Sequence, residues 1–158
     1  MKKTTLLIVF ILSSLITFSQ KKNYIITSYG AKGDRKTLNT QSIQNAIDAA
    51  SENGGGTVII PDGKFLISSL VLKSGVELHL SDKAILLGST NPYDYPYIKE
   101  ALVKNSPQNE SLGAVVEAKG QSNISITGKG TIDGQGRQLA LRIDSLFYAG
   151  ILDAKYYN

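Results

Sequence analysis

The stretch Gly54-Gly55-Gly56-Thr57-Val58-Ile59-Ile60-Pro61-Asp62-Gly63-Lys64-Phe65 decides the fold. Its three glycines are suited to end a helix, because glycine adopts positive φ without steric cost. The run Thr57–Ile60 has high strand propensity. Pro61-Asp62-Gly63 then supplies the fixed φ and the positive φ that a tight turn needs. We therefore expect a helix before this stretch and a strand with a tight turn within it.

A one-sided amphipathic helix is predicted just upstream, over residues 41 to about 53. Its apolar residues recur at i, i+3, i+4 and i+7 and are Ile43, Ala46, Ile47 and Ala50. Thr40 is expected to be the N-cap, because its hydroxyl can accept a hydrogen bond from the first helical turn. The stripe is made of small and medium side chains, which suits a helix lying across the end of another structure. Before it we expect a strand at Asn23–Thr27 and a polar turn at Ser28–Asp34.

Short apolar runs follow the opening strand in quick succession. Two or three residues separate them, which leaves no room for an intervening helix. Antiparallel hairpins would favour a glycine-rich primed turn at each link. Links such as Ser68-Ser69 and Ser81–Lys83 instead bend the chain without reversing it, as the corners of a parallel β-solenoid do. The runs are Phe65–Ile67, Leu70–Leu72, Val76–Leu80 and Ala84–Leu87.

Residues 88–113 interrupt this rhythm and are expected to form an exposed, aromatic excursion from one corner. The ladder then resumes, and the alternation of Ile124 and Ile126 with Ser125 and Thr127 predicts one buried face and one solvated face. The resumed runs are Ala114–Ala118, Asn123–Thr127 and Gly130–Gly134. The predicted fold class is therefore all-β, a parallel β-helix. At roughly 20 to 25 residues per coil, residues 57–134 hold about four coils. Residues 135–158 are expected to be an irregular tail.

Residues 1–19 read as a secretory signal: Lys2-Lys3, an apolar run from Leu6 to Ile16 that is too short to span a bilayer, and small residues before Gln20. The alternative is a membrane anchor. Removal of the signal leaves 139 residues and lowers the formal charge from +4 to +2, so the chain is nearly neutral. No basic cluster with aromatic residues suggests nucleic acid. The absence of cysteine means that an exported chain has no disulfides. We therefore expect one periplasmic or extracellular domain over residues 20–158, with no membrane contact after cleavage and no cofactor.

Four blocks of sequence resemble, in order and spacing, the N-terminal part of polygalacturonase-like enzymes of glycoside hydrolase family 28, within the pectin lyase-like β-helix superfamily. The blocks are Tyr29–Asp34, Ile43–Ala50, Gly55–Pro61 and Ile126–Gly136. The first and third also occur in pectate lyases and phage tailspikes, so the last block favours the hydrolase branch. The resemblance implies a right-handed parallel β-helix capped by the predicted helix, secreted, and acting on pectic or related acidic plant polysaccharide. It also implies an inverting mechanism with two carboxylates.

The motifs that carry the chemistry in this family are absent from the chain. They are Asn-Thr-Asp, an Asp-Asp pair, Gly-His-Gly and Arg-x-Lys, on coils beyond the last block. Here Asn39-Thr40 is followed by Gln41, and no two acidic residues are adjacent. The family's aromatic pair after Gly136 is replaced by Arg137–Leu141, which suggests a divergent branch. No residue is therefore assigned as catalytic or metal-binding, and the substrate-binding residues stay unknown.

Several polar and aromatic residues are candidates for a functional site. His79, the only histidine, and Glu77 share the outward parity of their strand and are expected to be solvated. Asp133 is expected to cap a turn through backbone N–H groups. The tyrosines of residues 93–97 could stack on sugar rings, but packing on the solenoid wall is the favoured interpretation. Gly54–Gly56 follow a helix, the wrong polarity for a phosphate site.

The leading hypothesis is an N-terminal piece of a secreted pectin-type glycoside hydrolase that is inactive alone. Its last coil would then present an unpaired strand edge. One alternative is a carbohydrate-binding or structural β-solenoid that works without catalysis and would need a C-terminal cap, which Lys155–Asn158 do not suggest. The other is a relative of the polysaccharide lyases, which would need acidic calcium ligands and a basic residue near the substrate. The polysaccharide is the expected partner, and the oligomeric state is left open.

Overall fold

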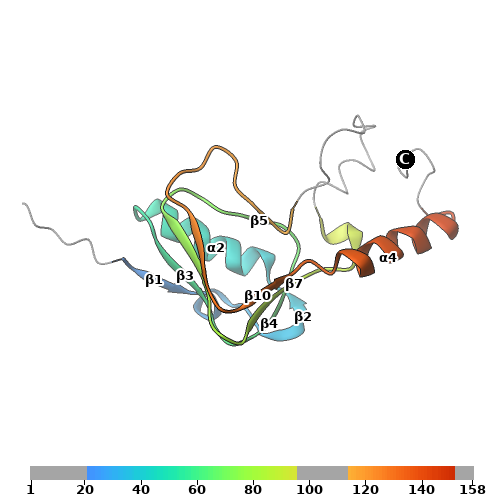
Figure 1. Ribbon diagram of the computed structural model, residues 1–158, viewed down its shortest axis with the longest axis horizontal. Coiled ribbons are helices and arrows are strands. Elements are labelled where there is room, and N and C mark those ends of the chain that lie inside the picture. The colour runs from blue at the N-terminus through green and yellow to red at the C-terminus, as the bar shows by residue number, and fades with distance from the viewer. Residues whose placement is uncertain (1–20, 96–113, 152–158) are drawn as a thin grey trace, which may run out of the picture.

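The computed structural model describes residues 21–95 and 114–151, and these form a parallel β-helix (Figure 1). The predicted signal peptide, Tyr97 and the residues 152–158 lie outside the described residues. No helix within the described ranges is long and apolar enough to span a bilayer.

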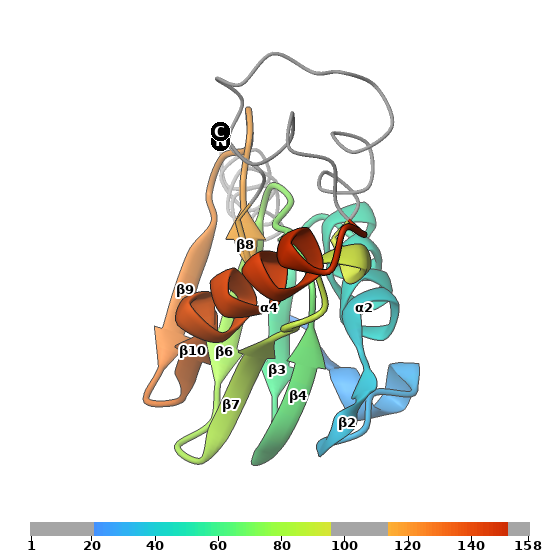
Figure 2. The same cartoon turned by 90° about the vertical axis from the view of Figure 1, so that its right-hand side faces the viewer.

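Three sheets form the walls of the β-helix, and every strand pairing within them is parallel. Sheet A has the order β1-β3-β6-β9, with β1 at Asn23–Ile25, β3 at Gly56–Ile60, β6 at Val76–Leu80 and β9 at Ser125–Gly128. Sheet B has the order β10-β7-β4-β2, with β10 at Thr131–Asp133, β7 at Ala84–Gly88, β4 at Gly63–Ile67 and β2 at Asp34–Leu38. Sheet C pairs β5 at Leu70–Val71 with β8 at Val116–Glu117. Figure 2 shows β7, β4 and β2 running side by side. Parallel pairing across corners of two or three residues confirms the solenoid that the sequence predicted.

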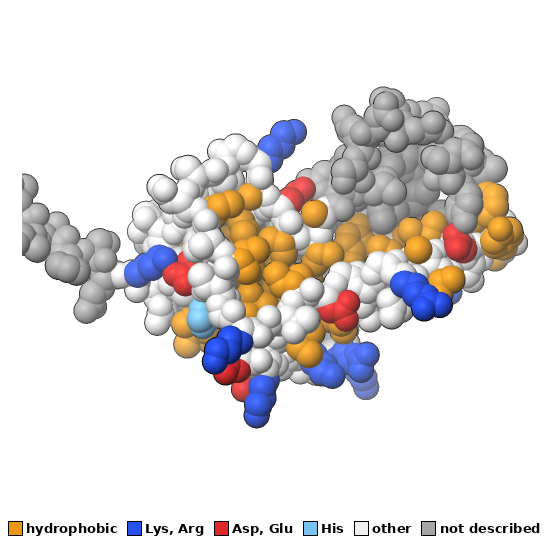
Figure 3. Space-filling model, in the orientation of Figure 1, with side chains coloured by type: hydrophobic (Ala, Val, Ile, Leu, Met, Phe, Trp, Pro, Cys, Tyr) orange, Lys and Arg blue, Asp and Glu red, His pale blue; other side chains and the backbone are white. Residues whose placement is uncertain are grey.

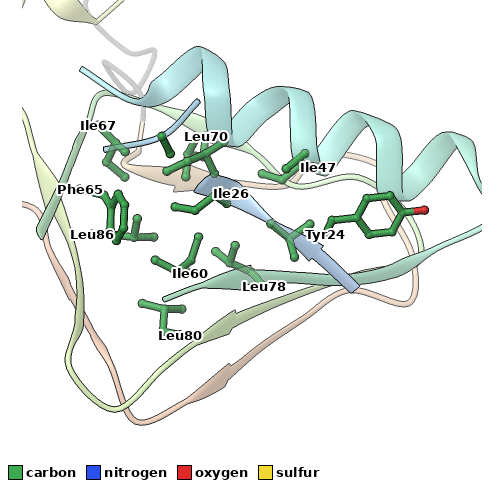
Figure 4. Packing of buried hydrophobic residues seen from close by; sticks show 14 of the residues in the cluster. Tyr24, Ile26, Ile47, Ile60, Phe65, Ile67, Leu70, Leu78, Leu80 and Leu86 are labelled. Atoms are coloured by element: carbon green, nitrogen blue, oxygen red, sulfur yellow. The ribbon is translucent and has the colours of Figure 1, made fainter. Parts of the chain in front are cut away.

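The core fills the space between the three sheets and the helix α2, Thr40–Glu52 (Figure 4). Alternate residues of each strand point inward, so β6 buries Val76, Leu78 and Leu80 and turns Glu77 and His79 outward. The predicted stripe of α2 lies in this core: Ile43, Ala46, Ile47 and Ala50 are all fully buried. Burial of these apolar groups is the main stabilising term of the fold.

The polar face of α2 satisfies the backbone of residues 68–74, along and around β5. Gln44 donates from Nε2 to the Val71 carbonyl oxygen and accepts from the Val71 N–H through Oε1, both at 3.0 Å. One turn before it, Thr40 Oγ1 accepts from the Ser68 N–H at 2.9 Å, and nearer the end of α2 Ser51 Oγ donates to the Ser74 carbonyl at 3.0 Å. The side-chain amide of Gln44 thus gives Val71 of β5 one hydrogen-bond donor and one acceptor, as the backbone of a neighbouring strand would. That α2 caps the N-terminal end of the β-helix stays a prediction.

Thr40 is not the N-cap that the sequence suggested. Asn39 occupies that position without a side-chain cap hydrogen bond, because its amide is engaged with Lys32, Thr37 and Leu66. The hydroxyl of Thr40 instead bonds to Ser68. Contacts to the strands therefore override the local capping preference.

Two elements differ from the expected pattern near the N-terminus. The strand predicted at Asn23–Thr27 ends at Ile25, and a 3-10 turn, η1 (Ile26–Tyr29), replaces its last residues. The polar run Asp34–Leu38, which showed no strand signal, forms β2 at the outer edge of sheet B. An edge strand exposes most of its side chains, which explains why its sequence is charged.

The tail expected to be irregular contains a helix, so that prediction was wrong. The helix α4 spans Gly136–Tyr148, and Figure 1 shows it extending away from the β-helix. Leu146 is buried, while Leu139 and Ile143, seven and three residues earlier, are half-buried. This i, i+4, i+7 stripe is weak but has helical spacing.

Candidate functional site

The outer face of sheet A carries a polar cluster built around Glu77. Strand register places Thr57 and Ser125 on either side of Glu77, and Ile59 and Thr127 on either side of His79. Thr127 Oγ1 donates to Glu77 Oε1 at 2.7 Å, and Thr57 Oγ1 donates to Oε2 at 3.2 Å. The Lys21 ammonium forms an ion pair with the same carboxylate. The cluster therefore links three successive strands of the sheet through one carboxylate.

The environment of Glu77 favours its charged form. The hydrogen bond from Lys21, and then that from Thr127, lower the pKa of Glu77 to about 2. A general acid of a glycosidase needs the opposite shift, since it must hold its proton near neutral pH. Glu77 is therefore suited to fixing neighbouring strands and unsuited to protonating a leaving group.

His79 adjoins the cluster, with Nδ1 lying 2.8 Å from Thr127 Oγ1. Thr127 already donates its single hydroxyl proton to Glu77, so His79 donates to Thr127 from a protonated Nδ1. The outward direction predicted for Glu77 and His79 is confirmed, but both are bonded as well as partly solvated. The sequence did not indicate Thr57 and Thr127 as partners, because this pairing depends on strand register across 20 to 50 residues of chain.

Asp133 caps a turn, as the sequence predicted. Its Oδ1 accepts from the Gln135 N–H at 2.9 Å, and Gln135 itself has a positive φ of 48°. This hydrogen bond accounts for the acid at the strand end. Asp34 has the same kind of role, and backbone N–H groups of Thr37 and Lys36 lower its pKa to about 2.

The tyrosines after β7 do not form one exposed stacking surface. Tyr95 is buried and donates its hydroxyl to the Ser89 carbonyl at 2.9 Å, and burial raises its pKa. Tyr93, in the 3-10 turn η2 (Pro92–Asp94), is 44% exposed. Ser89 and Asn91 both donate to Asp94, which orders the start of the excursion. Tyr95 is thus buried and hydrogen-bonded within its own turn, whereas Tyr93 is partly exposed.

No group of three or more metal-ligating side chains occurs within residues 21–95 and 114–151. Two other carboxylates there form ion pairs, Asp48 with Lys73 at 2.9 Å and Asp82 with Lys129 at 3.7 Å. Gly54 and Gly55 have φ values of 86° and 111° and close the C-terminal end of α2, which fits their interpretation as a helix stop. The described geometry therefore holds a stabilised sheet face and no assembled pair of catalytic carboxylates.

Comparison with protein families gives one match over residues 25–101, to the family described as rhamnogalacturonase A/epimerase, pectate lyase-like. The exo-poly-α-D-galacturonosidase of Dickeya chrysanthemi is 44% identical over 117 residues, which are 70% of this chain and 19% of the relative. The plasmin and fibronectin-binding protein A of Streptococcus pneumoniae is 39% identical over 113 residues, 70% of this chain and 15% of that protein. Alginate lyase 7 of Azotobacter vinelandii is 46% identical over 61 residues, 34% of this chain and 7% of the enzyme. The chain thus spans less than a fifth of each of these relatives.

Among solved structures, a putative glycosyl hydrolase from Parabacteroides merdae matches with a TM-score of 0.70 and 32% identity, over 85% of this chain and 54% of that structure. The family 28 exopolygalacturonase of Yersinia enterocolitica matches with a TM-score of 0.61 and 38% identity, over 73% of this chain and 21% of the enzyme. The parallel sheets, the matched family and these neighbours agree with the four blocks of sequence. The chain therefore belongs to the pectate lyase-like β-helix proteins and corresponds to the N-terminal portion of the polygalacturonases of glycoside hydrolase family 28.

Proposed function

We propose that this chain is the N-terminal part of an exported glycoside hydrolase that cleaves pectic or related acidic polysaccharide. In this proposal the chain starts the β-helix and sets its register, and catalytic carboxylates on later coils act by the inverting mechanism of the family. One acid would protonate the leaving oxygen while a carboxylate activates water on the opposite face of the sugar. The export signal at residues 1–19 forms part of the proposal.

The observation that carries the proposal is that the four family blocks fall, in chain order, on defined elements of the fold, the first at Tyr29–Asp34 between η1 and β2. The block at Ile43–Ala50 lies in α2, Gly55–Pro61 spans β3, and Ile126–Gly136 runs through β9 and β10. Similarity to polygalacturonases over the same region supports the same substrate class. The lowered pKa values of Glu77 and Asp34 fit an architectural role for this portion.

The direct test begins with the coding sequence beyond the codon for Asn158. If it encodes further coils with an Asp-Asp pair and Gly-His-Gly, the extended protein should release reducing ends from polygalacturonate or rhamnogalacturonan. The 158-residue chain alone should give no release above the blank. Product anomers followed by NMR during the first turnovers test inversion. Activity of the short chain by itself, or an extended protein without activity on uronate polymers, would contradict the proposal.

A non-catalytic binding module is the second candidate, and the similarity to the plasmin and fibronectin-binding protein supports it. Tyr93, 44% exposed in the ordered turn η2, is the ligand contact in this second proposal. Binding of the isolated chain to immobilised polygalacturonate, lost in Tyr93→Ala and unchanged in the exposed helix variant Tyr148→Ala, would favour this reading over the hydrolase. A lyase activity is the third, supported by the similarity to an alginate lyase, and absorbance of unsaturated products would reveal it.

A further inference from the structure

Positively charged side chains line one side of sheet B, close to where the chain turns into it from sheet A. They belong to β2, to β4 and to the corner before β7, which are neighbours in the sheet. Figure 3 shows Lys and Arg side chains projecting along the lower margin of the molecule, with acidic side chains between them. We call four of these cations, all exposed, the basic edge: Arg35, Lys36, Lys64 and Lys83.

Strand register places the cations of the basic edge near one another. Lys64 of β4 is the partner of Asp34 in β2 and of Ile85 in β7. Lys83 lies two residues before Ile85, and its carbonyl oxygen accepts from the Gly63 N–H at 3.3 Å. Because neighbouring strands lie about 4.8 Å apart, the cations form a row along the axis of the β-helix, with at least one cation from each of three neighbouring coils.

The acidic side chains of this region do not neutralise the row. Asp62 accepts from the backbone N–H of Lys83 at 3.3 Å, and Asp82 pairs with Lys129, outside the basic edge. Among the ion pairs within residues 21–95 and 114–151, none includes a cation of the basic edge. Their charges are therefore available to an anionic ligand.

The backbone of Arg35 is held in a conformation that arginine disfavours. Its φ is 64°, in the left-handed region, where a Cβ is crowded. Asp34 spans this residue, since its Oδ1 accepts from the N–H groups of Lys36 and Thr37 at 2.9 and 2.8 Å. The four residue steps from Asp34 to Leu38 also match only two steps of β4, so this part of β2 bulges from the sheet. Such strain at a position where glycine or asparagine would fit more easily points to a use for the arginine side chain.

An apolar strip runs beside the basic edge on the outer face of sheet B. Leu66 lies two residues beyond Lys64 on the same face, and strand register pairs it with Leu38 and Leu87. Leu38 is 44% exposed, and Leu66 is half-buried. The surface therefore presents cations along one line and aliphatic groups along a parallel line.

We propose that the basic edge and the adjoining Leu38 bind a linear polyuronate that runs along the axis of the β-helix. Carboxylates of the polymer would pair with the cations, and the C–H faces of its sugar rings would pack on the leucine. A row of cations repeated from strand to strand suits a ligand that repeats one carboxylate in each sugar. The choice of polyuronate rests on the proposed function, because this is the substrate class proposed there.

A lipid surface fits these residues less well than a polymer does. Binding in the plane of a membrane interface needs a broad apolar face beside the cations. Within residues 21–95 and 114–151, Leu38 is the one exposed large hydrophobic side chain on the outer face of sheet B. The narrow apolar strip therefore favours a thin, linear ligand.

The test measures binding of the 158-residue chain to immobilised polygalacturonate by biolayer interferometry. The chain should bind, the affinity should fall as NaCl is raised, and fully methyl-esterified pectin should not bind, because its carboxylates are neutral. Polyglutamate, an anionic polymer without sugar rings, should bind at least about fivefold more weakly. Binding is read without cleavage, whereas the proposed hydrolase is tested by the activity of the extended protein, so either idea can fail while the other stands.

Two double variants with the same change of charge provide the matched comparison. Arg35→Asn with Lys64→Gln should weaken binding to polygalacturonate at least about fivefold, because two exposed ion pairs are lost. Asparagine tolerates the left-handed region, so the urea midpoint of this variant should be no lower than that of the wild type. Lys119→Gln with Arg137→Gln removes two exposed cations from the loop after β8 and from α4, and should leave the affinity within about twofold.

The other outcomes overturn the proposal. A wild-type chain that does not bind polygalacturonate excludes the site. Equal binding of polygalacturonate and polyglutamate reduces it to general attraction of polyanions. Binding that Arg35→Asn with Lys64→Gln leaves intact places the ligand elsewhere, and loss of binding in Tyr93→Ala alone assigns it to η2. Binding to phosphatidylglycerol vesicles in place of polygalacturonate assigns the basic edge to a lipid surface.

Discussion

The first and last described coils of this β-helix differ in how their inward apolar side chains are covered. At one end α2 lies against the first coil, buries its apolar stripe and provides polar side chains to residues 68–74. At the other end β9 and β10 carry apolar residues that are 38% to 50% exposed. The difference shows that the inward side chains of one coil are buried by the coil or helix stacked on it, and within the described residues nothing of this kind is stacked on β9 and β10.

The comparison also separates two kinds of contribution to stability. At the end covered by α2, this one helix both buries its apolar side chains and provides hydrogen-bond partners for the backbone of residues 68–74. At the other end, β9, β10 and β8 pair with β6, β7 and β5, and within residues 21–95 and 114–151 no strand pairs with their outer edges. We therefore expect substitutions against α2 and between coils to lower the free energy of unfolding much more than substitutions at exposed Ile126 and Ile132.

The largest effect is expected where the last coil stacks on the one below. A Cβ at Gly128 would lie 1.9 Å from the Leu80 carbonyl oxygen, and the residue has a φ of 95°. Gly128→Ala should therefore lower the free energy of unfolding by about 4 kcal/mol or more, measured by urea denaturation. Hydrogen exchange should show lost protection in β9 and retained protection in α2.

Gly120→Ala is the control for this change. Gly120 also has a positive φ, 67°, but nothing lies within 4 Å of its added Cβ. It should cost only about 1 to 2 kcal/mol, the conformational penalty of alanine in the left-handed region. Equal losses for the two variants would mean that the coils do not approach as closely as Gly128 indicates.

Register partners in sheet A give the next largest difference. Leu78 is fully buried and Ile126, its partner on the last strand, is half exposed. Leu78→Ala should cost about 2 to 5 kcal/mol, as expected for a buried leucine, whereas Ile126→Ala should cost about 1 kcal/mol or less. Paired urea denaturation curves measure both. A similar loss at both positions would show that Ile126 is covered in solution.

The role of α2 as a cap is tested by Gln44. Gln44→Leu keeps the helix and the side-chain volume but leaves the N–H and C=O of Val71 without these partners. The expected loss is about 1 to 3 kcal/mol, the cost of an unsatisfied backbone group. Gln41→Leu, on the exposed side of the same helix, should stay within about 0.5 kcal/mol. If the two variants behave alike, α2 stabilises the first coil through its apolar face alone.

Much of the fold could be predicted from sequence because its strands are short, β-branched and separated by recognisable corners. The run Val76–Leu80 has the bounds of β6, and the stripe of α2 was predicted residue by residue. The strand β2 could not be predicted, because its residues are polar. They are tolerated in a strand because β2 lies at the edge of sheet B, and this position depends on the tertiary structure. The helix α4 was missed because its stripe is interrupted by exposed Leu141 and polar side chains.

The candidate site was less predictable, for a related reason. Strand parity alone placed Glu77 and His79 outward and Asp133 at a turn. The partners of Glu77 depend on the stacking of strands, which brings together Thr57 and Thr127 from 70 residues apart in sequence. Parity likewise predicted Ile126 to be inward, but its exposure depends on what lies beyond the last coil.

The smallest effect on the free energy of unfolding is expected from Glu77→Gln, and it should appear only at acid pH, where Glu77 takes up a proton. Its pKa is lowered in the folded protein to about 2, so its contribution to stability is present above the ordinary glutamate pKa and is lost as the pH falls toward 2. Lys21 is about half exposed, so solvent screening should keep the effect near or below about 1 kcal/mol. Urea denaturation at pH 7 and pH 3 should show a smaller acid-induced loss for Glu77→Gln than for the wild type, whereas Glu52→Gln, on the exposed end of α2, should behave as the wild type does. The Glu77 cluster joins β3, β6 and β9 through side chains on the outer face of sheet A. If the wild type and Glu77→Gln show the same pH dependence of the free energy of unfolding, the charge of Glu77 does not help to hold these three strands together.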